Sequence, residues 1–172
     1  MGGNFSGAGL KADNLVKIPL TGDKPDLNFP STNGTVNDIV SDGSGGWYVG
    51  GSFSQIGGVS KSNLARVLAN GSIDANFTPN PNNQVYTLLL SSGKLYAGGN
   101  FTNIGGIALN RLAAINPATG VATTWNPNMN NTVYDLAISG DTLFATGNFT
   151  TVGATAQDYF AMISATTAQL YQ

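Results

Sequence analysis

Short runs of apolar residues, separated by turn-forming residues, divide the chain into strand-length segments. The run at 85–90 is almost wholly apolar, which is typical of a strand buried on both faces. The next segment, 94–101, follows a Ser-Gly turn signal that recurs at Ser139 and Gly140. A third strand is predicted at 112–115, and a short fourth edge strand is predicted to end in Phe77 or Trp125 beside a proline. Because no helical period of useful length occurs, the pattern predicts an all-β chain.

This strand pattern repeats every 48 residues, and four separate positions in the unit carry the repeat. The clearest is a phenylalanine within GGNFS, GGSFS, GGNFT and TGNFT, at Phe5, Phe53, Phe101 and Phe149. A second position carries Phe29, Phe77 and Trp125, and a third carries Val85 and Val133, with Val36 one residue out of step. The fourth position carries Leu64, Leu112 and Phe160, with Leu15 one residue out of step. Four independent series with almost no insertions indicate a true internal repeat.

Four-stranded units that repeat every 40 to 50 residues or so are typical of β-propeller blades. The predicted fold is therefore all-β, a β-propeller section of about 3.6 four-stranded blades (172/48) with a 48-residue repeat. We expect one repeat array over 1–172, with blades at 1–34 (incomplete), 35–83, 84–131 and 132–172 (incomplete). A β-helix or a stacked solenoid is the rival architecture, and it is disfavoured because those folds have shorter periods.

The repeat also resembles a known family. The succession of aromatic-x-P, V-Y-x-L, LYAGGNFTNIGG and RLAAINPATG is similar to the delta-sixty repeats, a kelch-like β-propeller family of mostly bacterial proteins. The resemblance extends over nearly the whole chain, and GGxFxxIGG at 50–58 and 98–106 is its most specific part. The last copy departs from it, with Thr146 in place of the first glycine and Ala154 in place of the final one, so we expect a different backbone in that loop. The resemblance implies a surface or secreted repeat protein with no assigned chemistry.

Composition excludes most catalytic mechanisms. The chain contains no Cys, His or Glu, which removes thiol nucleophiles, imidazole bases, Ser-His-Asp triads and the usual zinc sites. Uncharged polar residues dominate, with 20 Asn, 23 Gly and 30 Ser plus Thr among 172 residues. The net charge of −2 offers no basic stripe to a nucleic acid. We therefore expect no enzyme activity, no cofactor, no bound metal and no nucleic-acid partner.

Loop geometry indicates where a ligand would bind. In an antiparallel blade the tight first-to-second and third-to-fourth turns share one end, so the long second-to-third loops and the blade-to-blade crossings must share the other. Ligand sites usually sit on such long loops held by a rigid scaffold. The candidate ligand-face residues are Gln55, Lys61, Asn82, Asn83, Tyr86, Asn103, Asn128, Asn130, Asn131 and Tyr134. The competing interpretation, which we favour, is that these asparagines bond nearby backbone groups and cap turns.

Two aspartates are the one possible source of chemistry. Asp38 and Asp135 occupy matching positions on the innermost predicted strand, where a propeller channel would be lined. Paired carboxylates can bind Ca²⁺ or act as acid and base. Thr87 stands at the intervening position and breaks the ring, so a solvated structural role is the preferred interpretation.

The preferred functional hypothesis is a non-catalytic module of a bacterial extracellular or cell-surface protein, serving adhesion, protein or glycan binding, or assembly. The alternatives are a glycan-active enzyme with an Asp-only site, and a passive spacer. Expected partners are other protein chains or further blades of the same protein, and surface glycans; membrane insertion is not expected, and the N-terminal stretch lacks signal-peptide features. Because 3.6 repeats are fewer than the roughly four blades of the smallest closed ring, we expect a section of a longer propeller or a protomer whose terminal blades pack against other chains.

Overall fold

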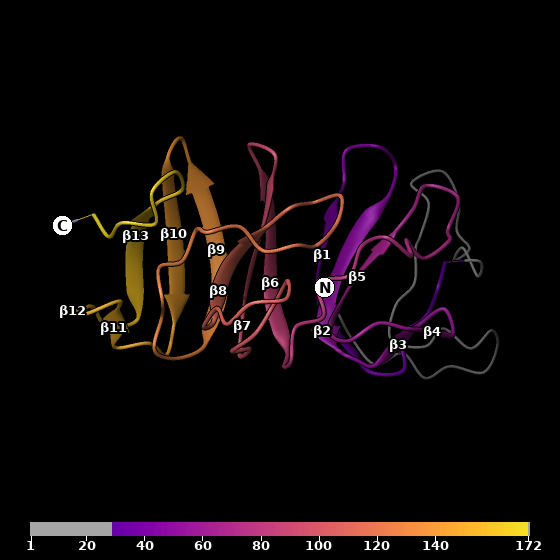
Figure 1. Ribbon diagram of the computed structural model, residues 1–172, viewed down its shortest axis with the longest axis horizontal. Helices are drawn as coiled ribbons and strands as arrows, with labels where there is room; N and C mark the ends of the chain where they lie inside the picture. Colours follow the sequence, from indigo (N-terminus) through magenta and orange to yellow (C-terminus); the bar gives the residue numbers. More distant parts are fainter. Residues whose placement is uncertain (1–28, 172) are drawn as a thin grey trace, which may run out of the picture.

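The computed structural model describes residues 29–171, and every regular element in that part of the chain is a β-strand. Nine of the strands form three antiparallel sheets of three strands each. Figure 1 shows the sheets side by side in chain order, each with its first strand leading into a central second strand. The sheets are β1 (Thr35–Ser41), β2 (Trp47–Ser52) and β5 (Leu64–Val67); β6 (Val85–Ser91), β7 (Lys94–Gly99) and β8 (Leu112–Ile115); and β9 (Val133–Ser139), β10 (Thr142–Gly147) and β13 (Phe160–Ser164).

The long second-to-third loops of the first and third sheets each contain a small hairpin. In the first sheet this is the ribbon of β3 (Gln55–Ile56) and β4 (Val59–Ser60), and in the third it is the ribbon of β11 (Thr151–Val152) and β12 (Thr155–Ala156). The second sheet has only a single bridge at this place, between Ile104 and Ile107. Residues 1–28 of the predicted first blade, with Phe5 and Leu15, lie outside the described residues, and the three sheets lie within 35–83, 84–131 and 132–172.

The predicted fourth strand is reduced to one bridge in each unit. These bridges join Val67 to Ile73, Ile115 to Ala122 and Ile163 to Leu170. Local side chains account for the shortening, because the Asp74 carboxylate accepts a hydrogen bond from the backbone N–H of Asn76, and the Thr123 hydroxyl accepts one from that of Trp125. Phe77 and Trp125, which were predicted to end this strand, are buried in the core, as residues that pack the blades together would be.

Within residues 29–171 the core consists of three clusters. One lies in the first sheet and its loops, one between the first and second sheets, and one between the second and third sheets. The repeated phenylalanines Phe53, Phe101 and Phe149 are all buried, and each lies in a different cluster. This confirms the prediction that residues one repeat apart occupy equivalent places. The second cluster joins the first two sheets, since Tyr48 and Leu64 pack with Leu95 and Ala113.

The two glycines of each GGxF sequence are required by close backbone and inter-sheet contacts. The second glycine lies opposite a β-bulge, and a Cβ at Gly51, Gly99 or Gly147 would stand 2.1 to 2.2 Å from a carbonyl oxygen of the bulged strand. The first glycine faces the next sheet, where a Cβ at Gly50 would lie 2.9 Å from Val85 Cγ1 and one at Gly98 would lie 2.8 Å from Val133 Cγ1. A bulge and a close blade-to-blade approach thus both explain the motif.

Two turn predictions had different outcomes. The departure at Ala154 does change the loop backbone, because Gly58 and Gly106 have φ of 76° and 89° whereas Ala154 is not among the residues with positive φ. The expected turn at Ser139 and Gly140 is wrong by one residue. Ser139 pairs with Thr142, so the turn residues are Gly140 and Asp141, and Gly140 supplies the positive φ of 59°.

Candidate functional site

Long loops and crossings meet at one end of the sheets, as predicted, and a repeated asparagine joins them. The Asn82 side-chain oxygen accepts hydrogen bonds from the backbone N–H groups of Thr102 and Asn103, while its amide nitrogen donates to the Thr102 hydroxyl. Asn130 makes the same three bonds with Thr150 and Thr151, and Asn33 makes them with Ser54 and Gln55. We call this arrangement the asparagine latch.

Two further candidate asparagines bond the backbone, and a third bonds another side chain. Asn83 and Asn131 accept hydrogen bonds from the N–H groups of the residues that follow them. Asn128 adopts a positive φ of 54° and its side-chain oxygen accepts a bond from Asn110. The backbone bonds of Asn83 and Asn131 support the turn-capping interpretation for these two residues.

Gln55 and Asn103 lie in the loops that the latch holds. Gln55 is exposed on β3 and Asn103 is half-buried, and the backbone N–H of each donates to a latch asparagine. Their side chains are therefore carried on fixed backbone at the long-loop end. This placement keeps both residues available to a ligand.

Lys61 does not reach the ligand face. Its side chain is buried, and its ammonium group donates a 2.6 Å hydrogen bond to the carbonyl oxygen of Phe77. Burial lowers the pKa of this lysine, and the nearby charge of Asp74 opposes the shift. The equivalent position one repeat later is Leu109, which is also buried, so comparison of the repeats could have shown that this is a core position.

The last two candidates, Tyr86 and Tyr134, lie together. Their ring centroids are 5.4 Å apart with an interplanar angle of 66°, an edge-to-face contact between neighbouring inner strands. Tyr86 is half-buried and its hydroxyl bonds to Gln84, whereas Tyr134 is exposed and its hydroxyl accepts a 2.9 Å bond from Asn148. We call these residues the tyrosine pair. Both tyrosines occupy the bulge positions of their strands. A bulge breaks the alternation of side chains between the two faces of a strand, which explains where these two side chains lie.

The inner-strand aspartates have separate roles. Asp38 accepts hydrogen bonds from the backbone N–H of Ile39 and, at 2.6 Å, from that of Leu88 on the neighbouring inner strand. Asp135 accepts a bond from the N–H of Leu136 beside it. The Asp38 carboxylate therefore joins two sheets, a structural role more specific than the solvated one expected from the sequence.

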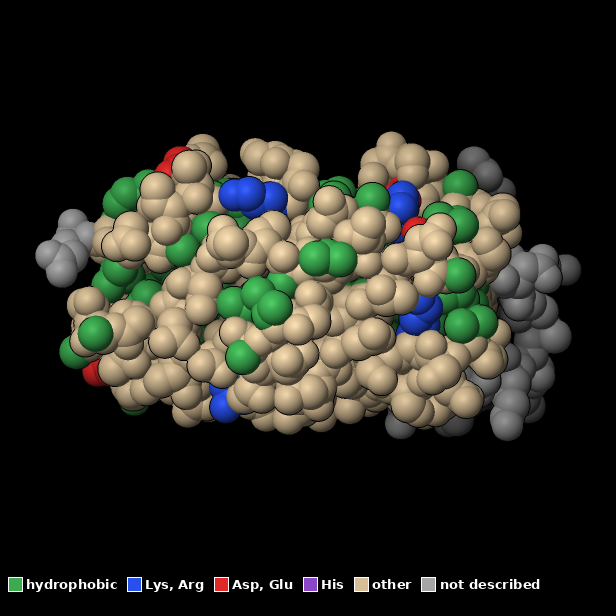
Figure 2. All heavy atoms as spheres, viewed as in Figure 1, with side chains coloured by type: hydrophobic (Ala, Val, Ile, Leu, Met, Phe, Trp, Pro, Cys, Tyr) green, Lys and Arg blue, Asp and Glu red, His purple; other side chains and the backbone are tan. Residues whose placement is uncertain are grey.

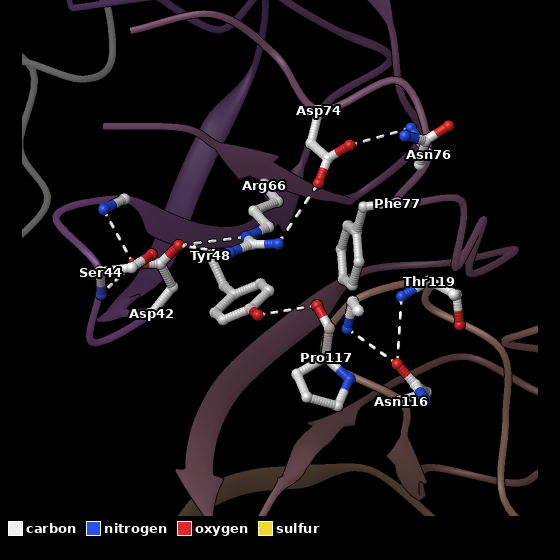
Figure 3. Close-up of polar contacts among 12 residues, drawn as sticks. Asp42, Ser44, Tyr48, Arg66, Asp74, Asn76, Phe77, Asn116, Pro117 and Thr119 are labelled. Atoms are coloured by element: carbon white, nitrogen blue, oxygen red, sulfur yellow. Dashed lines mark hydrogen bonds and ion pairs between the residues drawn. The ribbon is translucent and has the colours of Figure 1, made fainter. Parts of the chain in front are cut away.

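The opposite, short-turn end carries a charged cluster that the repeat pattern did not reveal. Figure 3 shows Arg66 between Asp42 and Asp74, at 2.7 Å and 3.4 Å, with its guanidinium 5.5 Å from the ring centroid of Tyr48. Burial raises the pKa of Asp42, but hydrogen bonds from Arg66 and from backbone N–H groups outweigh it and hold the value at about 2. The Tyr48 hydroxyl donates to the carbonyl oxygen of Pro117 on the next sheet, so the cluster stiffens a junction between sheets.

The repeat pattern does not indicate this cluster, because its charged residues do not recur in the second and third sheets. In the second and third sheets the positions equivalent to Arg66 hold Ala114 and Met162, so among the three described sheets only the first can form these ion pairs. Within residues 29–171 no group of three or more acidic, His or Cys side chains is arranged to hold a metal ion. The same part of the chain contains no helix long and apolar enough to span a membrane.

Comparison with known families gives one match. A family model described as a domain of unknown function (DUF5122) beta-propeller matches residues 42–77 and 90–118. The two matches begin exactly one repeat apart, at the turn before β2 and at the end of β6. No curated protein and no solved structure matches the chain.

Proposed function

We propose that this chain, an all-β section of a β-propeller, is a non-catalytic carbohydrate-binding module of the kelch-like, delta-sixty type that acts on the outside of a bacterial cell. The observation that carries the proposal is the tyrosine pair. An exposed tyrosine ring supported at its edge by a second ring offers an apolar face and a polar tip, the two features that a pyranose ring can use.

The groups around the tyrosine pair favour a neutral ligand. The side chains bonded to the two hydroxyls are the amides of Gln84 and Asn148. The exposed residues Asn83 and Asn131 each precede a tyrosine of the pair, Tyr86 and Tyr134, by three residues in the chain. Amides and hydroxyls can donate and accept hydrogen bonds, which suits the hydroxyl groups of an uncharged sugar. Charged residues make up only 9% of the chain, and few of them appear on the face shown in Figure 2. This composition suits an uncharged ligand better than an anionic or cationic one.

The rigidity of the long-loop end supports binding rather than catalysis. The asparagine latch fixes each loop to the preceding crossing, so the surface is organised before a ligand arrives. A binding module needs this preorganisation and needs no titrating group. Asp38, the aspartate closest to a catalytic role in the sequence, already uses both carboxylate oxygens for backbone N–H groups.

A glycan array of neutral hexose and N-acetylhexosamine oligosaccharides tests the proposal. The wild-type chain should be retained by a subset of these glycans, and Tyr134→Ala should weaken retention by about tenfold, the value of one aromatic contact. Tyr171→Ala is the matched control, because Tyr171 is exposed to a similar degree, 42% against 46%, and its hydroxyl bonds Asp141 at the other end of the sheet. Retention by none of the glycans, or an equal loss in both variants, would show that the tyrosine pair is not a sugar site.

A further inference from the structure

The bulge residues of the three inner strands form a row across neighbouring sheets. In the second and third sheets these residues are the tyrosine pair, and in the first sheet the bulge residue is Asn37. Asn37 is exposed, and its amide nitrogen donates a 2.8 Å hydrogen bond to the carbonyl oxygen of Val85, the residue before Tyr86. The side chain of Asn37 therefore reaches the next inner strand, as the ring of Tyr86 reaches that of Tyr134.

Gln84 adds a second link between the first sheet and the tyrosine pair. Its amide nitrogen donates a 3.2 Å hydrogen bond to the hydroxyl of Ser52 at the end of β2. Its side-chain oxygen accepts the hydrogen bond that the Tyr86 hydroxyl donates. One amide thus connects the junction of the first and second sheets to the junction of the second and third, and each junction has a described sheet on both sides.

The junction of the first and second sheets keeps hydrogen-bonding capacity beyond these contacts. Within residues 29–171 the side-chain oxygen of Asn37 accepts no hydrogen bond, and the hydroxyl of Ser52 is bonded as an acceptor only. An amide oxygen can accept two bonds, and a hydroxyl can donate as well as accept. This junction therefore offers one acceptor and one donor on side chains that their contacts with the second sheet already orient, which lowers the entropic cost of binding.

We propose that the ligand of the tyrosine pair is a linear, neutral oligosaccharide that runs across the inner strands, with one sugar unit on the tyrosine pair and a further unit over Asn37 and Ser52. This inference rests on the proposed carbohydrate-binding function and specifies the direction and length of the ligand. The junction of the second and third sheets supplies the aromatic contact. The junction of the first and second sheets supplies an acceptor and a donor for sugar hydroxyl groups.

Isothermal titration calorimetry with the disaccharide and the tetrasaccharide of one neutral glycan series tests the proposal. The wild-type chain should bind the tetrasaccharide at least about threefold more tightly, because the longer chain adds hydrogen bonds at the first junction. Asn37→Ala and Ser52→Ala should each reduce this gain with length, by about two- to tenfold, the net value of one hydrogen bond. Tyr134→Ala should instead weaken the binding of both oligosaccharides.

Asn70→Ala is the matched control. Asn70 is an exposed asparagine of the same unit, but its side chain bonds Ser72 in the third-to-fourth turn at the short-turn end. This variant should keep the full gain with length. Asn37→Ala also removes the bond to Val85, so circular dichroism checks its fold. Ser52→Ala removes a single hydroxyl that only accepts a bond, and it tests the same junction independently.

Two results would overturn the extended site alone. One is an equal affinity of the wild-type chain for disaccharide and tetrasaccharide, and the other is a gain with length that neither Asn37→Ala nor Ser52→Ala reduces. In both cases a loss of binding in Tyr134→Ala would still support the carbohydrate-binding function. If Tyr134→Ala leaves both affinities unchanged, or if no oligosaccharide binds, the tyrosine pair is not a sugar site and both proposals are wrong.

Discussion

Tyr48 donates a 2.7 Å hydrogen bond to the carbonyl oxygen of Pro117, 69 residues later and on the next sheet. The same relationship recurs one repeat on, where Tyr96 donates a 3.1 Å bond to Ala165, again 69 residues later. The central strands of the first two sheets are thus bonded to the third-to-fourth turn of the unit that follows. The contact that stabilises a blade therefore comes from its neighbour, which is the nearest-neighbour behaviour of repeat proteins.

The two tyrosine bonds should differ in their energetic weight. In Tyr96→Phe the carbonyl of Ala165 keeps the ammonium of Lys94 as a donor at 2.9 Å, so little should be lost. Tyr48→Phe should cost more, about 0.5 to 1.5 kcal/mol of unfolding free energy, the net value of a hydrogen bond. Urea unfolding of both variants measures the difference. Tyr159→Phe, at a residue 62% exposed, is the control and should be neutral. Equal losses in Tyr48→Phe and Tyr96→Phe would contradict this ranking.

Replacement of a repeated phenylalanine should be severe. Phe101 is fully buried, so Phe101→Ala removes its apolar contacts and leaves a cavity, at a cost of about 3 to 5 kcal/mol. Val121→Ala serves as the control because its side chain is exposed and should change stability by less than about 0.5 kcal/mol. Thermal unfolding checks both. An unmoved midpoint in Phe101→Ala would mean that the equivalent pockets do not stabilise the units.

The asparagine latch predicts local protection. In Asn82→Ala the N–H groups of Thr102 and Asn103 lose their acceptor, so their hydrogen exchange should accelerate. Asn82→Asp keeps the acceptor and loses only the bond donated to the Thr102 hydroxyl, so it should preserve most of the protection. Exchange measured by NMR at these two amides separates the variants. Equal exchange rates in wild type and Asn82→Ala would count against the latch.

Low pH should lower the free energy of unfolding, through the charged cluster at the short-turn end. The pKa of Asp42 is held at about 2, below its ordinary value near 4. A lowered pKa in the folded state stabilises the protein above the unfolded pKa, and this stabilisation is lost as the pH falls from about 4 towards 2.

Denaturant unfolding at several pH values measures this effect. Asp42→Asn should make the free energy of unfolding less dependent on pH in this window. Asp141, whose pKa is held at about 2 by hydroxyl donors from Thr166, Ser164 and Tyr171, contributes in the same direction. In the double variant Asp42→Asn/Asp141→Asn, the free energy of unfolding should therefore depend on pH even less. If the free energy of unfolding of Asp42→Asn falls with pH as steeply as that of the wild type, Asp42 is not a source of the acid sensitivity.

Much of the fold follows from periodicity, because a 48-residue repeat places equivalent residues in equivalent surroundings. The buried phenylalanines, the shared end of the long loops and the bulge beside each GGxF sequence could all be predicted this way. The fourth strand could not, because the competing bonds from Asp74 and Thr123 to the backbone depend on side-chain rotamers. The prediction that Lys61 lies on the ligand face was wrong. Its charge suggested an exposed side chain, but the ammonium group is buried because it donates a hydrogen bond to the carbonyl oxygen of Phe77.

The candidate site was predictable in part. The sequence placed the asparagines at the correct end of the sheets, and most of their side chains prove to bond backbone groups. The contact between Tyr86 and Tyr134 depends on two neighbouring bulges, and a spacing of one repeat does not reveal that their rings meet. The Asp42–Arg66 ion pair could not be predicted from the repeat, because Ala114 and Met162 stand at the positions equivalent to Arg66 in the second and third sheets.

Isothermal titration calorimetry, with the best-retained neutral oligosaccharide of the array injected into the wild-type chain, tests the central claim most directly. A non-catalytic module should give heats that saturate and return to baseline after each injection, and Tyr134→Ala should weaken the fitted affinity while Tyr171→Ala leaves it unchanged. Heat that continues after each injection until the oligosaccharide is consumed, and that disappears in an Asp38→Asn/Asp135→Asn variant, would instead identify an enzyme and contradict the account.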